Sequence, residues 1–282
     1  MLRHFSDIVH QNNFNVNVEY QRLHKLFFDN HELYIPYTGN RVSVYKVCKE
    51  NFKYMLFDNT CISLDDFNKT YGFNFEIYDE CYDIDYLILF CEYIYNLLDR
   101  LNNTIVSQKS RSAIYEDNSN EISRCAMQVL SVVKAANYTS VPKNNYTCFV
   151  PKDEIAVAIS EDVPELSQDI MFYSHQSLKH DLSAKRDILC HIANYLDNQE
   201  RRQYLKSKNG SLEHCLYPAF NNLYIRHNNI EPNDKQYNEV IAKMSEDELE
   251  SCYDDVYQLS LEALNTLRNK DRLKRIERLA VK

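Results

Sequence analysis

Residues 82–102 read YDIDYLILFCEYIYNLLDRLN, and this stretch decides the fold class. Its apolar side chains recur every three or four residues, at Leu87, Leu89, Phe90, Ile94, Leu97, Leu98 and Leu101. That spacing gives a helix one broad apolar face. The apolar run from Tyr86 to Leu98 contains Glu92 and is too short to cross a bilayer. The stretch therefore predicts a helix that packs into a protein core.

Helical periodicity continues over residues 121–136, 165–178 and 183–206. The chain has only three glycines, which excludes folds and phosphate loops that depend on glycine-rich turns. Residues 137–151 instead alternate around Asn144-Asn145, a pattern typical of a β-hairpin. The sequence thus predicts a mainly α protein, a helical bundle with a small β-hairpin element.

Shorter signals add detail to this outline. Residues 41–47 alternate between apolar and polar side chains, which indicates a short strand. Gly210 is expected to end the helix that precedes it. Ser63 is expected to cap one helix. Ser245 is expected to cap another, with Glu248 reaching back to complete a capping box.

With 282 residues, the chain can form one large domain or two modest ones. We expect residues 1–120 to be an N-terminal mixed, helical region of unknown role, and 121–164 to be a helix plus β-hairpin connector. Residues 165–282 are expected to form a helical bundle with a basic C-terminal tail. The net charge is −9, and the seven basic and two acidic residues of 268–282 make that tail +5.

The nine cysteines are odd in number, scattered and without a C-x-x-C pair, so neither a disulfide framework nor a zinc ribbon is predicted. The residues after Met1 lack the apolar segment of a signal peptide, which favours a cytoplasmic location. The acidic cluster at 246–255 has Cys252 as its only soft ligand. We therefore expect no metal and no cofactor.

The strongest chemical candidate is residues 220–232, FNNLYIRHNNIEP, which predict an amphipathic helix that ends before the proline. In one interpretation, His227 is the acid or base that cleaves RNA without a metal, and Arg226 stabilises charge on the phosphoryl group. Asn228 and Asn229 would then position the substrate. In the alternative, Arg226 and His227 only cap the last carbonyls of their own helix.

Arg186 and His191 form a second candidate pair. Five residues of helix turn the side chain by about 140°, so the two groups should diverge rather than share one phosphate. The alternative is an exposed Arg186 and a partly packed His191. The basic tail could contact phosphates, stay solvated, or pair with the acidic helix at 246–255.

Three features together resemble the HEPN-like helical domain of bacterial abortive-infection and toxin proteins. They are a helix with Arg186-Asp187, the segment Asn222 to Asn229, and a closing helix with Tyr253 and Tyr257, and they span residues 165–265. The resemblance implies a small helical bundle that dimerises, with an Arg-x(4–6)-His motif forming a metal-independent RNase site at the interface.

By this resemblance, Arg226 stands where the family's arginine closes its helix. This chain departs from the pattern because His227 is adjacent to Arg226, while the Arg-x(4)-His spacing occurs one helix earlier, at Arg186 and His191.

Two functions from different classes follow. The first is an endoribonuclease of phage defence or toxin type, with Arg226 and His227 catalytic and with Asn228, Asn229, Arg186 and His191 binding substrate. Its partners would be RNA and a second copy of the chain, and no membrane. The second is a non-catalytic helical protein–protein interaction module, antitoxin-like or phage-sensing. The resemblance also implies a third option, nucleotide binding.

Overall fold

The computed structural model describes residues 14–29, 33–35, 40–55, 57, 60–78, 83–107 and 116–280. The chain divides into two compact units, which we treat separately. The N-terminal unit holds residues 1–140 and 144–149, and the C-terminal unit holds 141–143 and 150–282. The chain therefore passes between the units in the hairpin of β3 (Tyr138–Lys143) and β4 (Tyr146–Pro151).

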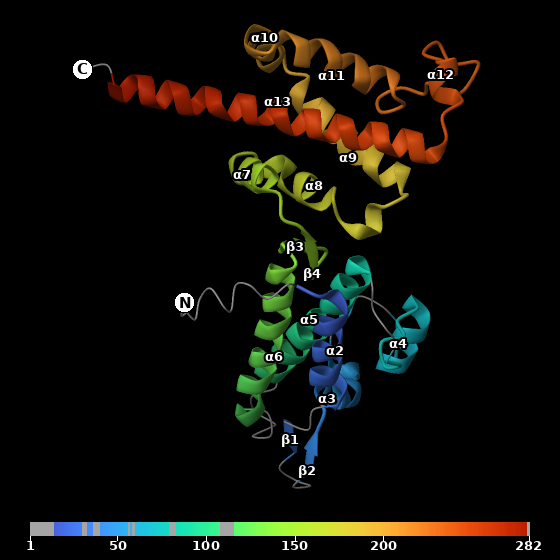
Figure 1. The fold of residues 1–282 in the computed structure, drawn as a ribbon, viewed down its shortest axis with the longest axis vertical. Helices are drawn as coiled ribbons and strands as arrows, with labels where there is room; N and C mark the ends of the chain where they lie inside the picture. Colours follow the sequence, from blue (N-terminus) through green and yellow to red (C-terminus); the bar gives the residue numbers. More distant parts are fainter. Residues whose placement is uncertain are drawn as a thin grey trace, which may run out of the picture. The chain divides into compact units, whose positions relative to one another are not determined.

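The predicted fold class is confirmed, since the described elements are helices apart from two two-stranded sheets (Figure 1). The N-terminal unit contains α2 (Val16–His24) with a π-helical continuation (Lys25–Asp29), β1 (Leu33–Ile35), β2 (Asn40–Val42), α3 (Val44–Asn51), a 3-10 turn (Phe52–Tyr54), α4 (Leu64–Tyr71), α5 (Ile84–Ser107) and α6 (Glu116–Ala135).

Helix α5 provides the centre of the N-terminal unit, as its periodicity predicts. Leu87 and Phe90 are fully buried, and α5 packs along α6. The rings of Tyr20 and Phe75 lie 5.0 Å and 4.9 Å from that of Phe90, so aromatic packing fills this core.

The strand expected over residues 41–47 is wrong beyond Val42. The Ser43 hydroxyl accepts a hydrogen bond from the Lys46 amide at 3.3 Å, which caps α3 and turns the alternating residues into a helix. The cap predicted at Ser63 is confirmed, because its hydroxyl accepts from the Asp66 amide at 3.2 Å.

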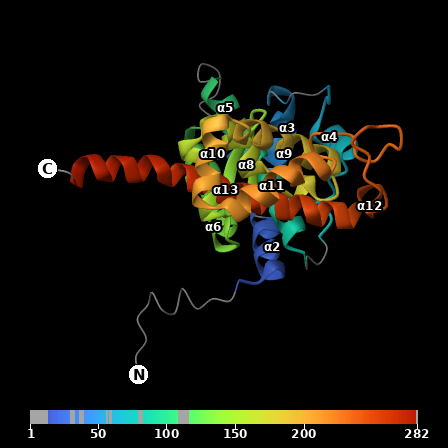
Figure 2. The same ribbon diagram turned by 90° about the horizontal axis from the view of Figure 1, so that it is seen from above.

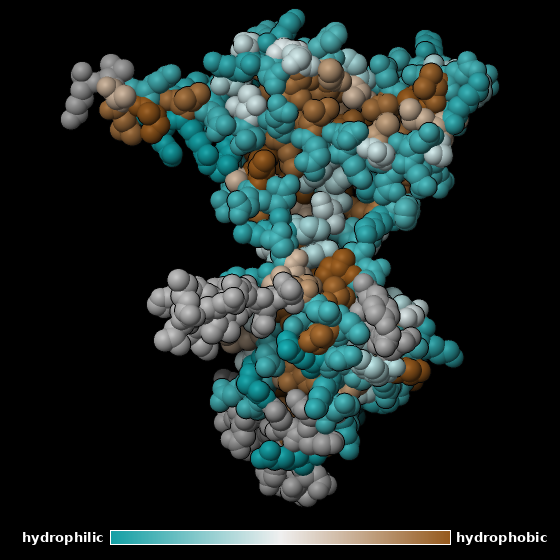
Figure 3. Space-filling model, viewed as in Figure 1, coloured by the Kyte–Doolittle hydropathy of each residue, from teal (hydrophilic) through white to brown (hydrophobic). Residues whose placement is uncertain are grey.

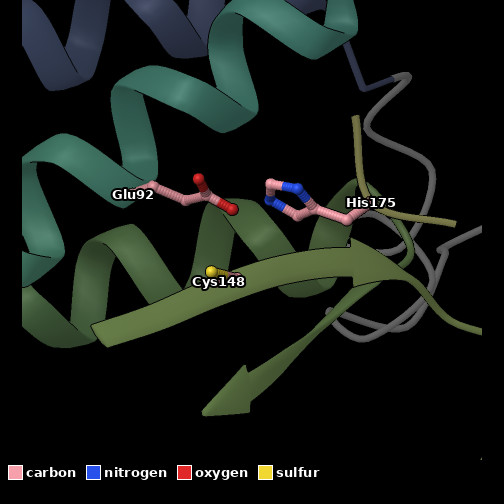
Figure 4. A group of neighbouring side chains, drawn as sticks. All are labelled: Glu92, Cys148 and His175. Atoms are coloured by element: carbon pink, nitrogen blue, oxygen red, sulfur yellow. The ribbon is translucent and has the colours of Figure 1, made fainter. Parts of the chain in front are cut away.

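The predicted hairpin is confirmed, and its turn is at Asn144 and Asn145. Their φ values of 49° and 65° are the left-handed pair that a tight hairpin turn requires. On β4, the Phe149 amide donates to the Glu92 carboxylate of α5 at 2.5 Å. Figure 4 shows Glu92 on its helix and Cys148 on the strand. His175, also drawn there, belongs to the C-terminal unit, where its ring stacks on Phe172.

The C-terminal unit contains α7 (Glu154–Asp162), a 3-10 turn (Pro164–Leu166), α8 (Ser167–Phe172), a second 3-10 turn (Gln176–Leu178), α9 (Leu182–Leu196), α10 (Gln199–Lys208), α11 (Gly210–Asn222), α12 (Glu239–Ala242) and α13 (Glu246–Ala280). Helix α13 runs through the unit and packs against α7, α9, α10 and α11 (Figure 1). The predicted capping box is confirmed, with Ser245 and Glu248 bonding each other reciprocally.

Two helix predictions in this unit are wrong at their ends. The helix expected over 183–206 is two helices, because Asn198 accepts hydrogen bonds from the amides of Glu200 and Arg201 and starts α10. Gly210 begins α11 instead of stopping its predecessor. None of the described helices combines the length and the apolar character needed to cross a membrane.

Candidate functional site

The helix expected to carry Arg226 ends earlier, at Asn222, and a loop connects it to α12. Asn229 organises that loop from inside, with 1% of its surface exposed. Its side-chain oxygen accepts from the Tyr224 amide at 2.9 Å, and its side-chain nitrogen donates to the Gln236 carbonyl at 2.7 Å. Its own carbonyl accepts from the Asn238 amide at 2.7 Å. The Asn229 side chain, which was predicted to bind substrate, is therefore already used for hydrogen bonds within its own loop.

Arg226 is engaged in the same way, but with a different helix from the one expected. Its Nη2 donates to the carbonyl of Ala193 at 2.5 Å, and its Nη1 lies 3.2 Å from the Asp197 carboxylate. Both acceptors belong to the C-terminal end of α9, where a cation is favoured by the helix dipole. Only 14% of the side chain is exposed. The guanidinium caps the C-terminal end of α9, and little of its surface stays exposed for contact with a phosphodiester.

His227 is exposed, unlike Arg226. It stands at a groove of about 480 Å³ together with Cys190, Asn194, Asp197, Arg202, Tyr217, Asn221 and Arg226. The other cation, Arg202, pairs with Glu213 at 2.7 Å and lies over the Tyr217 ring. Of the predicted catalytic pair, His227 is the residue whose side chain a ligand in the groove can reach.

Asn228, predicted beside Asn229 as a substrate-binding residue, is half-buried. Its Oδ1 is buried and has no hydrogen-bond partner among the described residues.

Arg186 and His191 diverge on α9, as their five-residue step predicts. The Arg186 Nε donates to the Ile225 carbonyl at 3.0 Å, and its guanidinium lies 4.1 Å from the centre of the Tyr224 ring. His191 is 63% exposed and lies 3.1 Å from Asp169. The alternative, an exposed Arg186 and a partly packed His191, is therefore wrong. Arg186 is the partly buried residue, and it bonds the loop that carries Arg226.

A second and larger groove, of about 650 Å³, lies along the second half of α13. We call it the basic groove. It is lined by Asp162, Val163, Tyr195, Asn198, Glu200, Arg201, Leu264, Leu267, Arg268, Lys270, Arg272 and Arg275. Five of these side chains are cationic and two are acidic. The groove is therefore positive, although the whole chain is negative.

The cations of the basic groove differ in how far they are neutralised. Arg268 bonds Asp162, and with Arg272 and Arg275 it lowers the pKa of that carboxyl below its ordinary value. Arg272 and Arg275 are exposed and form no ion pair with any side chain that the structure describes. Their charge is therefore available to a ligand.

The opposite wall carries a flat cationic surface. The Arg201 guanidinium lies 3.6 Å from the centre of the Tyr195 ring and donates to the Tyr195 carbonyl at 2.6 Å. A guanidinium held over an aromatic ring is a group on which a nucleobase can stack. The basic groove thus combines charge for phosphates with a platform for bases.

Lys185 forms an ionic cluster that the sequence did not reveal. It is 6% exposed and lies 2.8 Å from Glu250 and 2.7 Å from Asp254, about 70 residues away on α13. His180, at 3.0 Å from Glu250, adds a histidine to the acidic cluster. Burial acts to raise the pKa of Glu250, but the bonds from Lys185 and the His180 amide outweigh it and the pKa is lowered.

His180, Asp247 and Glu250 offer possible ligand atoms within 4.8 Å of one another, but the Lys185 ammonium lies 2.8 Å from Glu250 and its charge opposes a metal ion there. The cluster is best understood as an ion-pair network that fastens α9 to α13.

Comparison of the chain with known protein families, with characterised proteins and with solved structures yields no match. The HEPN-like resemblance and the phage-defence role it implies therefore stay predictions.

Proposed function

We propose that the C-terminal unit is a non-catalytic binding module that holds single-stranded RNA by its phosphates in the basic groove. The observation that carries the proposal is the surplus of cations there, with Arg272 and Arg275 exposed and unpaired among the described residues. Cationic side chains supply most of the affinity of a protein for a nucleic-acid backbone.

The shape of the groove supports a single strand. Arg201 on Tyr195 provides one stacking surface, and the cations of α13 line the facing wall. Proteins that bind single strands without sequence preference combine these two features, a positive groove and a stacking platform. A duplex hides its bases and would leave the platform unused.

The position of Arg226 favours binding over cleavage. Its guanidinium is hydrogen-bonded to the end of α9, and it belongs to a different groove from the unpaired arginines. A cleavage mechanism would need a cation beside His227 to stabilise the negative charge of the pentacoordinate transition state. Arg202, which lines the same groove, is already paired with Glu213.

The proposal is tested with the full chain and a labelled single-stranded RNA of mixed sequence, by fluorescence anisotropy over a range of salt concentrations. Arg272→Ala with Arg275→Ala should weaken binding. The double variant should also reduce the slope of log affinity against log salt by about 1.4, since each lost phosphate contact removes about 0.7.

The matched control is Lys235→Ala with Lys243→Ala, which removes the same charge from exposed positions near α12. Electrophoresis of the same RNA after incubation checks for turnover. Equal losses in the two double variants would show that binding follows net charge alone, and cleavage of the RNA would overturn the non-catalytic assignment.

A further inference from the structure

The second half of α13 carries an apolar stripe that the described residues of the C-terminal unit leave exposed. Leu273, Ile276 and Leu279 are 54%, 57% and 72% exposed. This part of the helix extends beyond the other helices of its unit in both ribbon views (Figures 1 and 2). Figure 3 shows hydrophobic residues gathered near its far end, among hydrophilic ones.

Leu273 and Ile276 do not continue the face by which α13 packs into its own unit, whereas Leu279, about 60° from Leu264, lies at the edge of that face. That face is buried at Tyr253, Tyr257 and Leu264. Nine residues separate Leu264 from Leu273, which at about 100° per residue places the two side chains about 180° apart. The positions that do continue the packed face, seven, eleven and fourteen residues after Leu264, are Asp271, Arg275 and Arg278.

The apolar side of the helix therefore changes at about Arg268. Basic residues then follow the packed side and line the basic groove, while Leu273 and Ile276 turn away from the packed side. A helix that only extended the bundle would keep its apolar residues on one side. The change of side indicates a partner that is not the C-terminal unit itself.

The spacing and the charges define the partner. Leu273, Ile276 and Ala280 recur at i, i+3 and i+7, the seam by which two helices pair. Residues 268–280 carry six basic and two acidic side chains. Two copies of this tail would repel each other, whereas acids flanking an apolar seam would complement it.

We propose that this stripe docks an amphipathic helix of another protein whose apolar seam is flanked by acidic residues. The docking proposal rests on other residues than the RNA proposal, namely Leu273 and Ile276 instead of Arg272 and Arg275. Either proposal can fail while the other stands.

The test uses the full chain and a labelled synthetic helical peptide with leucine at the seam positions and glutamate beside them. Two control peptides change one property each, with lysine in place of glutamate or serine in place of leucine. The wild-type chain should bind the first peptide at least about tenfold more tightly than the serine control, because burying even one aliphatic side chain is worth about tenfold in affinity. It should also bind it more tightly than the lysine control, because the basic tail repels lysine.

Leu273→Ser with Ile276→Ser should weaken the first peptide by at least about tenfold, from the same burial. RNA binding and the melting temperature should not change, because the stripe is exposed. Ile155→Ser with Val240→Ser is the matched control, since these side chains of the same unit are 50% and 66% exposed.

Three outcomes overturn the proposal. One is equal binding of the three peptides, or equal binding to the stripe variant. The second is a stripe-dependent dimer seen by light scattering, which makes the occupant a second copy. The third is stripe-dependent binding to phosphatidylglycerol vesicles with no preference for the acidic peptide, which makes the occupant a membrane surface.

Discussion

Replacing Arg226 by alanine should lower the free energy of unfolding of the C-terminal unit by about 2 kcal/mol. The largest part is the hydrogen bond from Nη2 to the Ala193 carbonyl, since a bond with a charged partner contributes about 1.5–3 kcal/mol. The ion pair with Asp197 adds up to about 1 kcal/mol, because that carboxylate is 49% exposed.

One term acts in the other direction. The Nε of Arg226 is buried and has no hydrogen-bond partner among the described residues, so its removal relieves about 1 kcal/mol of unfavourable desolvation. The balance of about 2 kcal/mol corresponds to a fall in melting temperature of about 6–10 °C for a domain of this size.

The assay should resolve the two units, because a single transition is not assured for a two-unit chain. Hydrogen exchange followed by mass spectrometry does this, and the variant should lose protection at the C-terminal end of α9. Arg226→Lys keeps the charge but loses the fork, so it should fall between alanine and wild type. His227→Ala is the matched neighbour and should change nothing. If the free energy of unfolding of Arg226→Ala is within about 0.5 kcal/mol of the wild-type value, Arg226 does not stabilise the end of α9.

Three further predictions follow from other contacts. Asn229→Ala should cost about 2–3 kcal/mol, because the loop amide of Tyr224 and the Gln236 carbonyl lose their partner; an unchanged exchange rate across residues 223–238 would contradict this. His227→Ala should leave RNA binding at the basic groove intact, whereas loss of an RNase activity in that variant would revive the catalytic hypothesis. Burial lowers the pKa of His24 from its ordinary 6.5. Above pH 6.5, neutral His24 should therefore not reduce the stability of the N-terminal unit. The unit should lose stability as the pH falls towards the folded-state pKa, because the unfolded chain takes up the proton first; an NMR titration of His24 at or above 6.5 would show the sign to be wrong.

Sequence patterns predicted those elements whose cause is local. The apolar period of α5, the Asn144-Asn145 turn and the Ser245–Glu248 capping box each depend on residues within a few positions of one another, and all three are confirmed. The break between α9 and α10 was also local. Asn198 gave the signal, a capping residue inside a helical pattern, and the periodicity on both sides of it concealed that signal.

The candidate site could not be predicted in the same way, because its partners are distant in sequence. Arg226 bonds residues 29 and 33 positions earlier, and Lys185 bonds residues more than 60 positions later. A basic residue that follows a helix can cap that helix or any other helix end that the fold brings near it. Sequence spacing decides only the first case, so the capping alternative named the right interaction and the wrong helix.

The two faces of α13 give the C-terminal unit its strongest functional argument. A helix of 35 residues is about 52 Å long, at 1.5 Å per residue, and the bundle buries only the part up to Leu264. Residues 272–280 are exposed, and ordering a stretch of helix without core contacts costs conformational entropy. Their cations and their exposed aliphatic side chains are the groups that would recover this cost in complexes. The far half of α13 should therefore exchange its amide hydrogens faster than the near half in the free protein. RNA and the acidic peptide should each slow that exchange, and equal protection along the whole helix before either is added would contradict this account.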